Sequence, residues 1–176
     1  MSTDTAAPET PTRPRIAGRA PARPAPAAAV HSVSAVTLVL LGLVAIGTAI
    51  HEPVLIPPLA ASAALVHSVP TLPFSQPRSV VVSHLLAAAA GYATLAVAGA
   101  GSAAAAVAAG VTLALTTLAR TPHAPACATA VVIVLQSPSP ARFVPLLFGA
   151  SIVLVLMEFV LSRIRRAAPR YPSYWW

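Results

Sequence analysis

Long apolar segments that hold almost no charged residues constrain this chain more than any other feature. The first runs from Val30 to Ile50, and three segments of similar length follow at 79–98, 102–119 and 142–161. A helix of about 20 apolar residues spans the hydrocarbon core of a bilayer, which is about 30 Å thick. The sequence therefore predicts a polytopic membrane protein rather than a soluble domain.

The charged residues support this interpretation. Only 9% of the residues are charged, whereas a soluble domain carries about 25%. All 11 basic residues are arginines, and eight of them lie toward the two ends of the chain. Basic flanks around an apolar middle are typical of membrane proteins, so the lipid bilayer is the expected partner and nucleic acid is not.

The reactive residues are few. The single cysteine excludes an internal disulfide, and the histidines lack the spacing and the carboxylate partners of a metal site. The 4 acidic residues are too few to supply an acid/base pair as well as a folded surface. We therefore expect no metal, no other cofactor and no enzymatic activity.

Three parts of the chain differ in composition. Residues 1–29 are rich in proline and arginine, which predicts a disordered tail. Residues 30–164 hold the apolar segments and form the predicted transmembrane domain. Residues 165–176 combine arginine with tyrosine and tryptophan, which is typical of an anchor at the membrane interface.

Two shorter apolar segments, 54–69 and 122–135, interrupt the series of long ones. Each has prolines near its start, and proline suits the first turn of a helix because that N–H has no intrahelical partner. Helices of about 14–16 residues are roughly 21–24 Å long, which is less than the hydrocarbon core. The predicted fold class is all-α, with four long transmembrane helices and two short helices that begin at prolines.

The two short segments resemble each other at a constant offset along the chain. Residues 58–66 lie over residues 125–133, and each stretch has a starting proline, small residues, one hydroxyl and then branched apolar residues. A long helix precedes and follows each of them, which predicts repeat halves at about 30–98 and 102–162. Alanine-rich segments also align by chance, so the repeat is a hypothesis.

The arginines leave two topologies open. If the short helices cross the membrane, ten of the 11 arginines lie on the cytoplasmic side, and if they are re-entrant, eight do. The positive-inside rule favours crossing and an inverted repeat, whereas the short length favours re-entrance. Both place the two termini in the cytoplasm. The abundance of alanine, arginine and proline is typical of a GC-rich bacterial genome, so a bacterial inner membrane is expected.

Short, proline-interrupted helices in corresponding halves indicate a transporter site. A helix N-terminus presents unpaired N–H groups and a partial positive charge, so two such ends near the midplane would attract a small anion. The candidate site residues lie at or beside these helix starts: Pro57, Ser62, Gln76, Arg78, His84, Arg120, Thr121, His123, Pro125 and Thr129.

Each candidate also has a structural alternative. The two arginines attract the anion, or they extend to lipid headgroups. The two histidines bind the anion or relay a proton with it, or they cap a helix and bond to a neighbouring one. The two hydroxyls of the short helices line the site, or they bond to the carbonyl one turn back. Glu158, near the end of the last long segment, is expected to pair with the arginines that follow it.

Five stretches of the chain form an ordered set of motifs, at 56–63, 76–79, 83–86, 120–130 and 170–175, and the fourth contains His123-Ala124-Pro125. In this order they resemble the HPP family of integral membrane proteins, and His123-Ala124-Pro125 occupies the place of the family's signature. The resemblance implies four spans. Some plastid and cyanobacterial members are described as nitrite transporters, so it also implies a transporter or channel for a small inorganic anion, with nitrite as the leading candidate.

A second functional class stays open beside transport. The chain would then be a non-transporting membrane sensor or assembly module that binds a partner through its tails. Small residues on several helices permit close helix contacts, so a homo-oligomer is compatible with both classes.

Overall fold

The computed structural model describes residues 22–164 and 170–175, and these ranges contain helices and no strand. The prediction of an all-α fold is therefore confirmed for the described residues. The helices are α1 (Pro26–Ile50), α2 (Pro57–Ser68), α3 (Pro77–Ala98), α4 (Ser102–Leu118), α5 (Pro125–Gln136) and α6 (Pro140–Ile164), and a short 3-10 helix, η1 (Pro73–Ser75), precedes α3.

Three of these helices, α1, α3 and α6, are long and apolar enough to cross a membrane. The sequence predicted four. The helix that falls short is α4, which has 17 residues. The first helix begins at Pro26, earlier than the predicted Val30, because a proline followed by three alanines forms a first helical turn readily. Residues 1–21 of the predicted tail lie outside the described residues.

Proline begins five of the six α-helices, including the short helices α2 and α5 with 12 residues each. The exception is α4, which follows the turn at Gly99 and Gly101. These two residues have φ values of 73° and 156°. Glycine adopts such positive φ values at low cost, and the turn lets α4 run back along α3.

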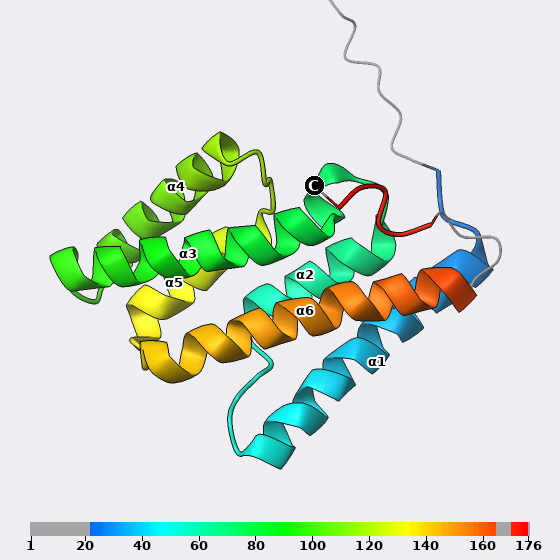
Figure 1. Cartoon of the computed structure of the whole chain (residues 1–176), viewed down its shortest axis with the longest axis horizontal. Coiled ribbons are helices and arrows are strands. Elements are labelled where there is room, and N and C mark those ends of the chain that lie inside the picture. Colours follow the sequence, from blue (N-terminus) through cyan, green and yellow to red (C-terminus); the bar gives the residue numbers. More distant parts are fainter. Residues whose placement is uncertain (1–21, 165–169, 176) are drawn as a thin grey trace, which may run out of the picture.

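The helix α3 lies at the centre of the molecule and packs against α4, α5 and α6, while α2 packs against α1, α5 and α6. Figure 1 shows α4 and α1 on opposite sides, with the other helices between them. One apolar cluster joins α1, α2 and α6 around Leu43, Leu59 and Leu154. A second cluster consists largely of alanines of α3, α4 and α5, where small side chains allow the helix backbones to approach closely.

Residues 170–175 lie beside the start of α3 (Figure 1). Tyr171 is buried, and its hydroxyl donates to the Ser75 carbonyl at 2.9 Å. Burial, and then the charge of Glu158, raise the pKa of Tyr171, so the hydroxyl remains a donor. In the segment predicted as an interfacial anchor, Tyr171 thus lies inside the protein, while residues 165–169 and 176 lie outside the described residues.

Candidate functional site

Two buried histidines share one serine hydroxyl in the interior. His84 lies two turns into α3, and His123 lies just before the start of α5. The Ser62 Oγ of α2 lies 2.9 Å from His84 Nε2 and 2.8 Å from His123 Nε2. The two rings meet edge to face, with centroids 5.2 Å apart. Three elements that are far apart in the sequence therefore meet at one oxygen atom, and we call this group the His84–Ser62–His123 chain.

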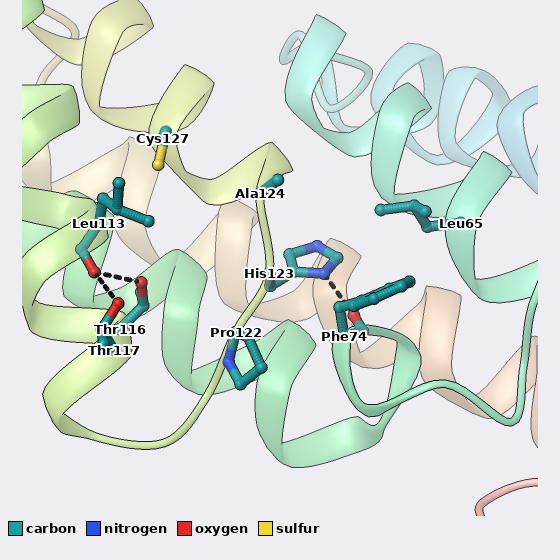
Figure 2. A pocket seen from close by; sticks show the side chains of 9 residues that line it. All are labelled: Leu65, Phe74, Leu113, Thr116, Thr117, Pro122, His123, Ala124 and Cys127. Atoms are coloured by element: carbon teal, nitrogen blue, oxygen red, sulfur yellow. Dashed lines mark hydrogen bonds between the residues drawn. The ribbon is translucent and has the colours of Figure 1, made fainter. Parts of the chain in front are cut away.

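The other nitrogen of each ring also has a partner. His84 Nδ1 lies 2.8 Å from the Thr129 Oγ1 of α5. His123 Nδ1 donates to the Phe74 carbonyl at 2.7 Å, as Figure 2 shows. The His84–Ser62–His123 chain is thus extended at both ends, and hydroxyls from both short helices bond to the two nitrogens of one ring, His84.

No carboxylate of the described residues is paired with the His84–Ser62–His123 chain. The described residues include two acids in ion pairs, and both pairs are made elsewhere: Glu158 with His67, and Glu52 with Arg142. An imidazolium buried without a counter-charge is costly. Burial therefore favours the uncharged form of both rings.

A pocket of about 310 Å³ adjoins His123 between α2, α4 and α5. No charged side chain of the described residues lines it. Figure 2 shows the hydroxyls of Thr116 and Thr117 turned back to the Leu113 carbonyl, at 3.1 and 2.7 Å. Its surface is therefore mainly apolar, and the lining residues are Leu65, Phe74, Leu113, Thr116, Thr117, Pro122, His123, Ala124 and Cys127.

The structure brings four of the predicted site residues together: Ser62, His84, His123 and Thr129. Arg78 instead donates from Nη2 to the Ala119 carbonyl at 3.0 Å, where α4 ends. A cation at a helix C-terminus complements the helix dipole. This contact shows how Arg78 can hold α3 and α4 together.

The remaining candidates lie around the cluster. Gln76 joins two segments, because its Nε2 donates to two carbonyls of the α2–α3 connection and its Oε1 accepts from the N–H of Ser173. The two helix-starting prolines differ, since Pro57 is exposed and Pro125 is buried. Thr121 is buried, and its carbonyl accepts a hydrogen bond from Ser83, but its hydroxyl has no partner among the described residues.

Arg120 is exposed and ends α4 in a left-handed conformation, with φ at 55°. For a residue other than glycine this left-handed conformation costs about 1 kcal/mol of conformational free energy. We expect Arg120→Gly to raise the free energy of unfolding by about 1 kcal/mol, measured by unfolding in detergent. Arg120→Ala is the control, since it removes the charge and keeps the backbone cost. An equal gain from both variants would assign the effect to charge and contradict this account.

A buried polar pair that was not predicted from the sequence joins α2 and α6. His67 Nδ1 lies 2.5 Å from Glu158 Oε2, and the two side chains are 0% and 2% exposed. The expectation that Glu158 pairs with the arginines after it is corrected for the part of the chain that the structure describes, where its partner is His67. Arg163 lies over the Phe159 ring instead. A carboxyl inside an apolar segment needs a buried partner, and that rule is the signal that could have led to His67.

Comparisons with known proteins agree with a membrane protein. A sequence model of the HPP transmembrane region matches residues 21–172. A transmembrane protein of Dictyostelium discoideum is 34% identical over 132 residues, which are 70% of this chain and 46% of that relative. The chain thus spans less than half the length of this curated relative. No solved structure gives a significant match.

Proposed function

Because the chain belongs to the HPP family of transmembrane proteins, we propose that it is a transporter or channel for a small monovalent anion. Nitrite is the leading candidate, from the resemblance to family members described as nitrite transporters. We propose no catalytic reaction and no nucleic-acid partner. The lipid bilayer and the anion are the proposed partners of the protein. Homo-oligomerisation through small-residue helix faces is compatible with it.

One observation carries this proposal, namely the meeting of both short helices at a buried polar cluster beside a pocket. Ser62 of α2 and Thr129 of α5 bond to the two nitrogens of His84, and His123 lines the pocket. Histidines inside a membrane domain are costly and mark pathways for solutes and protons. A pocket of about 310 Å³ has room for a small anion and several waters, at about 30 Å³ each.

The helix packing supports an inverted repeat around this cluster. If α1, α2 and α3 exchange with α4, α5 and α6, the pairs α3–α4, α3–α5 and α4–α5 become α6–α1, α6–α2 and α1–α2, and all six pairs pack in this protein. Ser62 and Thr129 occupy equivalent positions of the two halves. We propose that the repeats are inverted around the midplane, that α4 also crosses, and that both termini are cytoplasmic in a bacterial inner membrane.

We expect purified protein in proteoliposomes to take up nitrite faster than empty vesicles, and His123→Ala to lower this uptake about tenfold, the effect of losing roughly one hydrogen-bonded contact. His51→Ala is the matched control, because His51 is exposed at the end of α1. Unchanged uptake by His123→Ala would show that the anion does not pass through this pocket. No uptake of nitrite, nitrate or formate by the wild type would contradict transport.

The hydrogen bonding also favours one alternative, a non-transporting membrane module. All four ring nitrogens of His84 and His123 are bonded within the protein, as in a cluster that only holds helices together. Such a module would bind its partner through the chain ends. Deleting residues 1–21 distinguishes the two functions. A transporter would keep its nitrite uptake, whereas a module would show no nitrite uptake before or after the deletion and would lose its partner.

A further inference from the structure

The hydrogen bonds at the site have a fixed direction when both rings are neutral. A carbonyl oxygen only accepts, so the hydrogen of His123 must lie on Nδ1, which faces the Phe74 carbonyl. Nε2 of the same ring then has no hydrogen and accepts from the Ser62 hydroxyl. Because Ser62 has a single hydrogen, it accepts from His84 Nε2, and His84 Nδ1 accepts from Thr129.

The same atoms accommodate one additional proton without breaking this connection. With a hydrogen on both nitrogens, His123 donates through Nε2 to Ser62 and still donates through Nδ1 to Phe74. The Ser62 oxygen still accepts from His84 Nε2, and the Ser62 hydrogen turns to the Pro58 carbonyl, which lies 2.9 Å away. Reorientation of one hydroxyl therefore changes the His84–Ser62–His123 chain from a neutral to a protonated form.

A positive charge on His123 would stabilise an anion in the adjoining pocket. This pocket is lined by apolar groups and by threonine hydroxyls that are bonded to Leu113, and no arginine of the described residues lines it. An anion in a mainly apolar pocket is unfavourable unless a positive charge or a proton accompanies it. Two titratable residues line the pocket, His123 and Cys127. A cysteine thiol cannot carry a positive charge, so His123 is the residue of the lining that can.

We infer that the His84–Ser62–His123 chain takes up one proton when the anion enters this pocket, so that the anion and the proton move together. This inference rests on the proposed function. An N–H bond forms at His123 Nε2 while an O–H bond of hydronium or of the solute acid breaks, and the proton returns to water when the anion leaves. The transported species is then electrically neutral in sum.

The other charged and titratable groups near the chain are held by different partners. On α2, His67 pairs with Glu158 of α6. On α3, Arg78 donates to the end of α4. On α5, Thr129 is bonded to His84, and the α2–α3 connection contributes the Phe74 carbonyl. The proton that accompanies the anion is therefore assigned to the two rings of the chain.

Proteoliposomes that contain a pH-sensitive dye test this inference with nitrite as the probe. We expect nitrite uptake above that of empty vesicles to acidify the lumen by one proton for each nitrite, and an inside-negative potassium diffusion potential to leave its rate unchanged. Uptake that the potential slows, without acidification, would overturn the inference and leave the proposed function standing. The absence of protein-dependent uptake would overturn both.

Two serines provide a matched pair of variants. Ser62 and Ser151 are both buried, and each hydroxyl lies within hydrogen-bond distance of the carbonyl one turn back, at 2.9 and 2.7 Å. Only Ser62 also reaches the histidines. We expect Ser62→Ala to lower proton-linked nitrite uptake about tenfold, and Ser151→Ala to leave it within about twofold. Equal effects of the two substitutions would contradict the inference.

Nitrogen-15 spectra of the histidine rings in lipid nanodiscs give a readout that does not depend on flux. We expect the neutral His123 to carry its hydrogen on Nδ1 and His84 on Nε2, with the two rings assigned from His84→Gln and His123→Gln. Adding nitrite at constant pH should convert one of the two rings to the form protonated on both nitrogens. The reverse tautomers, or rings that stay neutral with nitrite, would overturn the inference.

Discussion

Replacing Glu158 by alanine is expected to lower the free energy of unfolding by about 3–5 kcal/mol. The side chain of Glu158 is 2% exposed and bonds to His67, whose side chain is fully buried. Removing the carboxyl leaves His67 buried without a partner on Nδ1, and its Nε2 already has none among the described residues. Unfolding in mixed micelles with increasing SDS measures the loss.

A second acid of the same chain provides the control. Glu52 lies 3.3 Å from Arg142, but the side chains of this pair are 31% and 76% exposed. Exposed pairs contribute about 0–1 kcal/mol, so Glu52→Ala should cost less than about 1 kcal/mol. Similar losses for Glu52→Ala and Glu158→Ala would contradict the assignment of His67 and Glu158 as a buried pair that stabilises the fold.

Replacing Gly91 by leucine is expected to destabilise the protein by about 3 kcal/mol. A Cβ atom on Gly91 would lie 3.0 Å from the Ile133 Cβ and 3.2 Å from the Ala130 Cα. The larger leucine side chain would force α3 and α5 apart at this point. The same displacement would separate His84 from Thr129, so we also expect slower nitrite uptake in the fraction that folds.

Gly110 on α4 is the matched position for this experiment. A Cβ atom there would meet nothing within 4 Å, so Gly110→Leu should leave the stability unchanged or raise it by about 0.5–1 kcal/mol, because glycine lowers helix stability. Unfolding in mixed micelles compares the two variants. If Gly110→Leu destabilised the protein as much as Gly91→Leu, a contact of α4 with another copy of the chain would explain the loss better than packing against α5.

Local signals in the sequence predict the order of the helices well. Prolines and glycine-rich turns show where helices begin, and the long apolar stretches correspond to α1, α3 and α6. The boundaries are less accurate: α1 begins earlier than predicted, and α4 is shorter than a spanning helix. Hydropathy does not define the ends of a helix, because α1 already begins at Pro26, before the strongly apolar run, and α4 ends at Leu118 although the apolar Ala119 follows.

The contacts between helices could be predicted only in part. Ser62, His84, His123 and Thr129 were expected near one another, because they lie beside the starts of the short helices or within α3. Their exact bonding was not, and the pairing of His67 with Glu158 was missed. Helices that are apolar on all sides carry no stripe that shows which face turns inward, so the partner of a buried polar group depends on packing between distant segments.

The central place of α3 has a consequence for biosynthesis. Ribosomes deliver the chain from its N-terminus, so Ser62 is already present when α3 emerges, but the segment with His123 and Thr129 follows only after α4. During that interval His84 has half of its final hydrogen bonds, and Ser83 lacks the Thr121 carbonyl that accepts its hydrogen bond. The first half of the protein therefore lacks these hydrogen-bond partners when it is inserted. The second half must pack against it before the buried polar groups of α3 are all hydrogen-bonded.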